Sequence, residues 1–148
     1  MAKRFNFRLG QVLNLRKQIE DVRVRELAQA KSRLLEIENI LKANAEVEGE
    51  FLGTYKVMAE GEVFNVDEAI VYSNYKDWLG RKKKEYKGLE SEWALEVERR
   101  RREAVKASKQ RRLLENFKEK QERKHEKEVL SEEQKFLDDI SSIAFLRR

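Results

Sequence analysis

The sequence contains no proline in its 148 residues, although an average usage of about 5% would place roughly seven in a chain of this length. Proline breaks helix interiors because it lacks a backbone N–H and because its ring clashes with the preceding turn. Charged residues make up 41% of the chain, and hydrophobic residues make up 40%. A proline-free chain so rich in Glu, Lys, Arg and Leu is expected to be almost entirely helical.

Cysteine is also absent, which excludes disulfides, thiolate metal sites and cysteine nucleophiles. No apolar run approaches the roughly 18 residues of a membrane-spanning helix, so no such segment is predicted. The first residues lack the apolar stretch of a signal peptide. The simplest expected location is therefore the cytoplasm.

Glycine and histidine are scarce, and neither forms a recognisable site. The six glycines do not fall in the spacing of a Walker phosphate-binding loop. The single histidine, His125, stands in a run of Lys and Glu and is expected on a solvated helix face. The sequence therefore predicts no metal site, no cofactor and no catalytic residue, and the chain is not expected to be an enzyme.

Apolar residues recur at spacings of three and four, which places them on one face of a helix. The first such stripe includes Val12, Leu15, Ile19 and Val22, shifts its phase by one residue, and continues over 27–58. A stripe of about two positions in seven is typical of a coiled-coil seam, whereas a helix in a compact globule has a wider apolar face. The sequence therefore favours a coiled coil with little closed core.

The apolar pattern breaks at residues 59–68 and then resumes. Gly61 is expected to end the first helix. Asn65 followed by Glu68 predicts a capping box for the second helix, with Asp67 as a competing N-cap. The second stripe begins with Tyr72, Tyr75, Leu79, Lys82, Tyr86, Leu89 and Trp93.

Two long helices joined by a short turn favour an antiparallel hairpin. We therefore predict an all-α fold and one coiled-coil domain over residues 1–148, with helices at about 9–58 and 68–142 and a turn at about 59–67. Residues beyond about 116 are expected to extend past the start of the first helix. Apolar residues at 136–146 would then need cover, from another molecule or from residues 5–9, and the unpaired seam also allows self-association.

Basic residues are in excess, with a formal net charge of +5, and the excess lies in the second half. The tracts at 81–84 and 99–102 could meet phosphates. Consecutive helical residues point in different directions, however, and the chain has no nucleic-acid recognition motif. A basic coiled-coil nucleic-acid-binding protein and a general chaperone-like protein stay open as alternatives, but no dedicated nucleic-acid partner is expected.

The two ends of the sequence resemble those of one protein family. The segment FNFRLGQVLNLR at 5–16 resembles the F-x-F-x-L-x-x-V-L-x-L-R opening of the FliJ family, the coiled-coil stalk proteins of the bacterial flagellar type III export apparatus. The segment EQKFLDD at 133–139 resembles the E-Q-K-x-L-D-E block of the same family, with Asp139 where the family often has Glu.

This resemblance implies a fold similar to the central stalk, or gamma subunit, of rotary ATPases. It also implies that the paired termini enter the hexameric flagellar export ATPase and promote ring assembly and ATP hydrolysis. Further partners implied are the regulator of that ATPase, the cytoplasmic part of the membrane export gate, and export chaperones. The implied location is the cytoplasm, with peripheral association at the inner membrane of the flagellar base.

With the family in view, we assign two sets of contact residues. The set expected to contact the ATPase ring lies at the chain ends and comprises Phe5, Phe7, Leu9, Arg16, Gln134, Lys135, Leu137 and Asp138. The set expected to contact the export gate lies among the aromatic residues near the turn and comprises Phe51, Tyr55, Tyr75, Leu79 and Tyr86. Ordinary packing in the seam is the alternative role for Leu9, Leu137 and the residues near the turn. For Gln134 and Asp138 the alternative role is a local network at the end of the helix.

Overall fold

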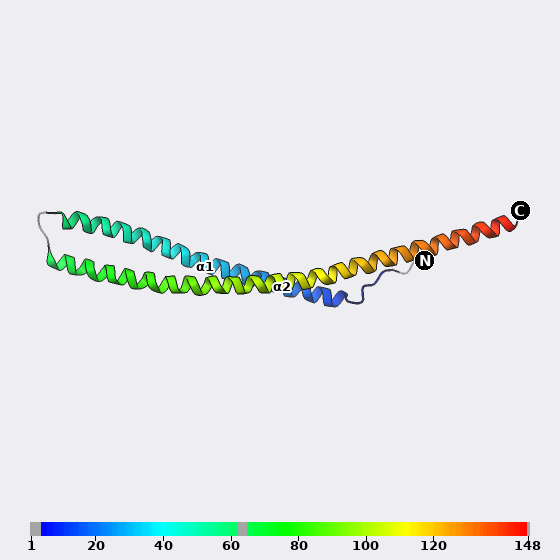
Figure 1. The fold of residues 1–148 in the computed structure, drawn as a ribbon, viewed down its shortest axis with the longest axis horizontal. Helices are drawn as coiled ribbons and strands as arrows, with labels where there is room; N and C mark the ends of the chain where they lie inside the picture. Colours follow the sequence, from blue (N-terminus) through cyan, green and yellow to red (C-terminus); the bar gives the residue numbers. More distant parts are fainter. Residues whose placement is uncertain (1–3, 62–64, 148) are drawn as a thin grey trace. The chain divides into compact units, whose positions relative to one another are not determined.

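The computed structural model describes residues 4–61 and 65–147. Within them it contains two helices, α1 (Gly10–Ala59) and α2 (Val66–Leu146), of 50 and 81 residues (Figure 1). The all-α prediction is confirmed. Helix α2 begins two residues before its predicted start and ends four residues after its predicted end. None of the described helical stretches is both long and apolar enough to cross a bilayer.

The helices form an antiparallel hairpin, because residues early in α1 meet residues late in α2. Arg16 Nη1 donates a hydrogen bond to Gln110 Oε1 at 2.9 Å. Nearer the turn, Lys83 Nζ lies 3.4 Å from Glu48 Oε2. The predicted hairpin of two packed helices is therefore confirmed.

The chain divides into two compact units, which are described separately. We call residues 1–22 with 105–148 the terminal unit, and residues 23–104 the turn unit. Each unit contains a part of α1 and a part of α2. The expectation of a single domain stays a prediction.

Asn65 is the N-cap of α2. Its Oδ1 accepts a hydrogen bond from the backbone N–H of Asp67 at 3.0 Å, and its carbonyl accepts one from Ala69 at 3.1 Å. Asp67 therefore lies within the first turn, where its negative charge is favoured by the positive end of the helix dipole. The prediction of Asn65 as the cap is confirmed, and the competing assignment to Asp67 is wrong.

The seam of the turn unit is apolar. Its buried hydrophobic side chains belong to Ala30, Ile37, Leu79, Val97 and Ala104. These positions come from both predicted stripes, which the turn unit therefore confirms. Ile37 is the one large side chain among them that is almost completely shielded, with 1% of its surface exposed.

The seam of the terminal unit differs from the predicted one. Leu13 is buried, whereas the predicted seam residues Val12, Leu15 and Val22 are 41%, 54% and 49% exposed. Hydrogen-bonded polar side chains, such as that of Arg16, take seam positions here. The fourth member of the predicted stripe, Ile19, is half-buried, so the prediction is wrong for Val12, Leu15 and Val22 only.

The segment before α1 packs against the later part of α2. The Phe7 ring lies 6.1 Å from the Phe117 ring, and the Phe5 ring lies 5.7 Å from His125, between centroids. His125 is accordingly half-buried, and its expected place on a solvated face is wrong. The prediction that α2 extends past the start of α1 beyond about residue 116 agrees with the contact between Phe7 and Phe117. Phe5 and Phe7 contact α2 at positions 125 and 117, not at 136–146, and every residue from 131 to 147 is exposed.

Candidate docking surfaces

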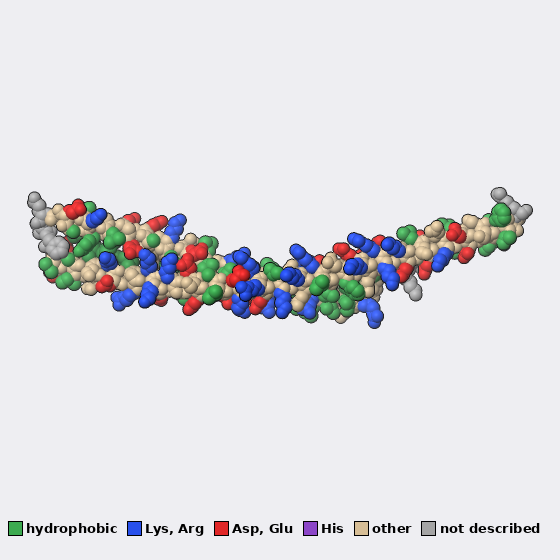
Figure 2. Space-filling model, in the orientation of Figure 1, with side chains coloured by type: hydrophobic (Ala, Val, Ile, Leu, Met, Phe, Trp, Pro, Cys, Tyr) green, Lys and Arg blue, Asp and Glu red, His purple; other side chains and the backbone are tan. Residues whose placement is uncertain are grey.

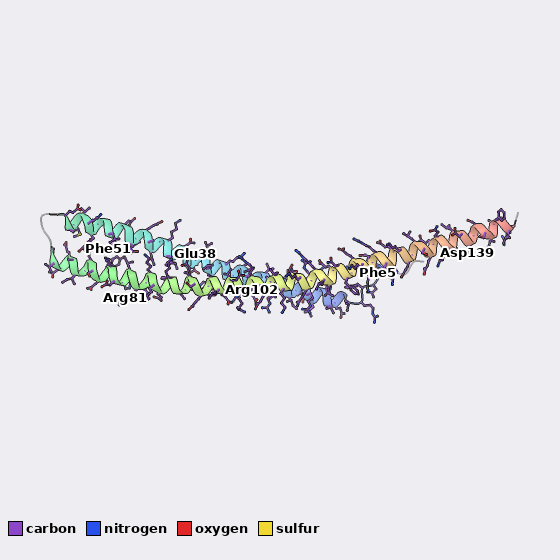
Figure 3. All side chains as sticks on the ribbon, viewed as in Figure 1. Phe5, Glu38, Phe51, Arg81, Arg102 and Asp139 are labelled. Carbon is purple, nitrogen blue, oxygen red and sulfur yellow. The ribbon has the colours of Figure 1, made fainter. Side chains whose placement is uncertain are left out.

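The first candidate surface is the uncovered end of α2 in the terminal unit, which we call the C-terminal surface. Its apolar side chains recur at helical spacing and are about half to two-thirds exposed: Phe136, Leu137, Ile140 and Ile143. Figure 3 shows Asp139 on this part of α2, beyond the position of Phe5. A helix with an apolar stripe and no partner in its own chain is suited to pack against another protein.

Three predicted ring-contact residues carry polar groups on this segment. Gln134, Lys135 and Asp138 are all exposed. The backbone carbonyl of Asp138 accepts a hydrogen bond from Ser142 Oγ at 2.8 Å, and the residue itself is exposed. Among the described residues, neither Lys135 nor Asp138 forms an ion pair, so both charges are available to a partner.

The four predicted ring-contact residues of the N-terminal segment lie elsewhere in the terminal unit. Phe5 and Phe7 are half-buried against α2, and Arg16 is half-buried in the seam through its bond to Gln110. Leu9 is 37% exposed. The structure therefore brings the aromatic residues of this segment to α2 but does not place them beside 134–138.

A network of charged residues joins the two helices of the terminal unit. The Arg111 guanidinium binds both Glu20 of α1 and Glu115 of its own helix, and Lys17 Nζ lies 4.0 Å from Glu115 Oε1. The hydrogen bond from Arg111 lowers the pKa of Glu20, and the same bond raises the pKa of Arg111. The side chains of Arg111 and Glu20 are mostly shielded, and their ion pair joins α1 to α2 in the terminal unit.

A second electrostatic cluster lies on α2 in the turn unit. Arg99 and Arg100 both donate hydrogen bonds to Glu96, with closest distances of 2.6 Å. The bonds from Arg99 and then Arg100 lower the pKa of Glu96 to about 2. Arg101 and Arg102 lie 3.7 and 3.5 Å from Glu98. The arginine tract is thus largely paired along its own helix, which reduces its capacity to bind phosphates.

The hairpin is expected to lose stability as the pH falls from 4.5 to about 2. The pKa values of Glu20 and Glu96 are lowered in the folded chain. Above the pKa of the unfolded state, both ionised carboxylates therefore stabilise the folded chain, and this stabilisation is lost as the pH falls through the pKa of the folded state. Thermal unfolding followed by circular dichroism across this range measures the loss. Glu20→Gln should flatten the profile, whereas Glu38→Gln, at an exposed carboxylate (Figure 3), should not. Identical profiles for the Glu20 variant and the unmodified protein would contradict the interhelical pair.

The second candidate surface is an aromatic cluster in the turn unit, where hydrophobic side chains gather between the two helices (Figure 2). The Phe51 ring lies 4.8 Å from Tyr72 and 5.0 Å from Tyr75, between centroids. Tyr55 lies 5.8 Å from Tyr72, and Trp78 stacks on Tyr75 at 5.8 Å. The cluster joins both helices close to the turn and leaves several rings partly in solvent.

The predicted export-gate residues divide into packing and exposed positions. Leu79 is buried and Tyr86 is half-buried, whereas Tyr55 and Tyr75 are each 38% exposed. Trp78 is 46% exposed and belongs to the same surface, although it was not assigned to it. The sequence could have indicated this position, because Trp78 directly precedes the seam residue Leu79 and so lies beside the seam.

Neither candidate surface contains a cluster of metal-ligating side chains among its described residues. Among residues 4–61 and 65–147, no three His, Cys, Asp or Glu side chains lie together so as to hold a metal ion. The chain exposes 12,615 Å² of surface. A globular protein of 17.7 kDa would expose about 8,000 Å². A large share of its side chains is therefore accessible to partners.

A comparison with protein-family models matches residues 5–148 to the family described as the flagellar FliJ protein. The chain belongs to the FliJ family. The match includes the segments 5–16 and 133–139, and it confirms the resemblance to the FliJ family that these segments indicated. No curated protein and no solved structure gave a significant match.

Membership of the FliJ family makes the chain a component of the flagellar export apparatus. The family contributes to flagellar biogenesis at the flagellar base, and it is a structural export component and not a known enzyme family. The partners of the chain are therefore to be sought within the export apparatus.

Proposed function

We propose that the chain docks into the hexameric flagellar export ATPase through the end of the terminal unit and promotes ring assembly and ATP hydrolysis. The observation that carries this proposal is the exposure of every residue from 131 to 147 in a helix with an apolar stripe. The chain supplies the docking element, and the ATPase supplies the catalytic residues.

The energetics favour a protein partner for this segment. Full burial of a large apolar side chain stabilises a complex by about 1.5–3 kcal/mol. Phe136, Leu137 and Ile140 are 65%, 60% and 48% exposed, so most of that stabilisation is still available. The adjacent charges of Lys135 and Asp138 would fix the orientation of docking, because charge complementarity contributes chiefly to specificity.

In this proposal the N-terminal residues support the docking helix. Phe5 and Phe7 hold the segment before α1 against α2, and Arg16 ties α1 to Gln110. Leu9 and the outer edges of the two aromatic rings are left to contact the ring. Pairing both termini in one unit would present them to the ATPase together, as in the central stalk of a rotary ATPase.

The aromatic cluster of the turn unit is the proposed contact for the cytoplasmic part of the export gate, with Tyr55 and Tyr75 as its exposed members. Tyr and Trp are favoured at interfaces because they combine large apolar area with a polar group. The regulator of the ATPase and the export chaperones are further proposed partners. With these contacts the chain would work in the cytoplasm, peripherally associated with the inner membrane.

Asp138→Lys is expected to raise the amount of chain needed for half-maximal stimulation of the cognate export ATPase by at least about tenfold, because reversal of one charge at a close contact weakens binding and about 1.4 kcal/mol of binding free energy corresponds to a factor of ten. The matched control is Asp77→Lys, which makes the same change at an exposed aspartate of α2 in the turn unit. ATP turnover is measured with increasing amounts of each variant, and circular dichroism verifies that helicity is unchanged. Equal stimulation by both variants would contradict docking through Asp138, and no stimulation by the unmodified chain at any ratio would refute the proposed function.

The alternative of dedicated nucleic-acid binding is less well supported, since the most basic tract is paired along its own helix. Phosphate attraction alone would weaken steeply and uniformly with salt, without sequence or structure preference. A general chaperone would protect unrelated unfolded proteins from aggregation, whereas the stalk proposal predicts binding only to export-apparatus components.

A further inference from the structure

The terminal unit carries a second exposed apolar surface on the flank of its seam. It is formed by side chains that are 41–68% exposed, and we call it the flank surface: Val12, Leu15, Val22, Leu113 and Phe117. On α1 these residues recur at helical spacing but avoid the face of Leu13 that packs against α2. Hydrophobic side chains are visible on this part of the molecule, over the first turns of α1 (Figure 2).

Contacts within the terminal unit bring the two halves of the flank surface together. Arg16 lies one turn after Val12 on α1 and donates its hydrogen bond to Gln110 of α2. Gln110, Leu113 and Phe117 follow at spacings of three and four on one side of α2. The two halves of the flank surface therefore meet near Arg16 and Gln110, and the ring of Phe7 lies against Phe117 at the end of this surface.

The flank surface and the C-terminal surface carry opposite charge. Residues 131–146 contain four acidic residues and one basic residue, and the basic residues Arg147 and Arg148 follow them. The part of α2 that borders the flank surface, residues 105–118, contains five basic residues and one acidic residue. The two apolar surfaces of one chain are thus electrostatically complementary, which favours their association.

One chain cannot join its own two surfaces. Helix α2 is continuous from Val66 to Leu146. Leu113 and Leu137 are therefore separated by about 36 Å along a single helix. The C-terminal surface can reach a flank surface only on another molecule.

We infer that two copies of this chain associate antiparallel, with the C-terminal surface of each on the flank surface of the other. The α2 part of the flank surface and the C-terminal surface lie on either side of about residue 125. A two-fold axis near that residue therefore places each of these α2 segments against the other segment of the second copy. Such an isologous arrangement closes after two copies and forms each contact twice. Because each contact forms twice, the buried area of the interface is also doubled, and a specific interface buries at least about 1,200 Å² in total.

The dimer does not depend on the proposed function, but it has a consequence if that function holds. The C-terminal surface includes Leu137 and neighbours Asp138, which are proposed to contact the ATPase ring. Dimerisation and ring docking would then exclude each other, and the free protein would keep its docking surface covered until the ATPase competes for it.

Sedimentation velocity of the full chain over a wide concentration range tests the association. The unmodified chain is expected to shift from monomer to dimer as its concentration rises. Ile143→Lys removes an apolar contact and places positive charge against the basic flank, so it should shift the dimerisation midpoint to at least tenfold higher concentration. Ile70→Lys is the matched control, because Ile70 has the same 54% exposure but lies in the turn unit, and it should leave the midpoint unchanged.

The absence of cysteine allows the arrangement to be mapped directly. A short bifunctional thiol reagent should link Leu113→Cys of one copy to Leu137→Cys of another when the two single variants are mixed. The pairing of Val57→Cys with Leu137→Cys should give no link, since Val57 lies in the turn unit. A monomer at every concentration, equal linking of both pairs, or efficient linking of Leu137→Cys to itself would each overturn the antiparallel dimer.

Discussion

Removal of residues 131–148 is expected to abolish stimulation of the export ATPase and to return its turnover to the level of the ATPase alone. The deleted segment contains the apolar stripe and the three polar ring-contact residues Gln134, Lys135 and Asp138. Because residues 131–147 are all exposed, their loss removes no buried side chain from the rest of the hairpin. The helical signal per residue and the unfolding midpoint of the shortened chain should therefore stay close to those of the full chain.

The shortened chain also separates the two proposed docking surfaces. It retains the aromatic cluster around Phe51 and Tyr75, so binding to the cytoplasmic part of the export gate should persist. Loss of both activities together with loss of helicity would indicate a folding defect and would contradict the claim that 131–147 adds nothing to the fold. Full stimulation by the shortened chain would place the ATPase contact elsewhere.

Ile37→Ala is expected to lower the free energy of unfolding of the hairpin by about 2–5 kcal/mol. Ile37 is 1% exposed, and the other buried hydrophobic side chains of the described residues are few and include three alanines. A thin seam has little other buried area to compensate for the cavity. A loss of this size is a large fraction of the total stability of a small domain, which is typically about 5–15 kcal/mol.

Leu35→Ala provides the control for this substitution, because Leu35 lies two residues away on α1 but is 57% exposed. Its effect should stay within about 0.5 kcal/mol, as is usual for surface positions. Urea unfolding followed by circular dichroism gives both values. Equal destabilisation by the two substitutions would show that α1 does not bury the Ile37 face against α2.

The helices were predictable because local rules govern them. The absence of proline and the three-and-four spacing of apolar residues predicted both helices, and the side chain of Asn65 predicted the start of α2. The apolar seam of the turn unit followed from the same spacing, since Ile37, Leu79 and Val97 are buried there.

The seam of the terminal unit was not predictable by the same rule. Arg111 binds Glu20 across the helices, and Arg16 binds Gln110, so polar side chains take positions that a hydrophobic pattern assigns to apolar ones. Val12 and Leu15 do lie at helical spacing, but their side chains are exposed on the flank of the seam. An ion pair between the helices depends on how two segments that are distant in the sequence align. The spacing of residues within one helix does not predict this alignment.

The docking surfaces were predicted in part. The sequence indicated an uncovered apolar end and an aromatic cluster near the turn, and the structure contains both. The packing of Phe5 on His125 was not predicted, because the segment before α1 is not helical and its path depends on contacts distant in the sequence. Tyr75 and Leu79 belong to the same predicted apolar stripe, but Tyr75 is exposed and Leu79 is buried, and the sequence pattern did not distinguish them.

Site-specific photo-crosslinking at position 137 tests the proposed docking most directly. A photoreactive residue replacing Leu137 is expected to link to the cognate export ATPase, whereas the same residue replacing Val57, which is also well exposed, should not. The yield at position 137 should rise when nucleotide assembles the ATPase into a ring. Linking at position 57 but not at 137, or no linking at either position under conditions that stimulate ATP turnover, would contradict docking of the paired chain ends in the ATPase.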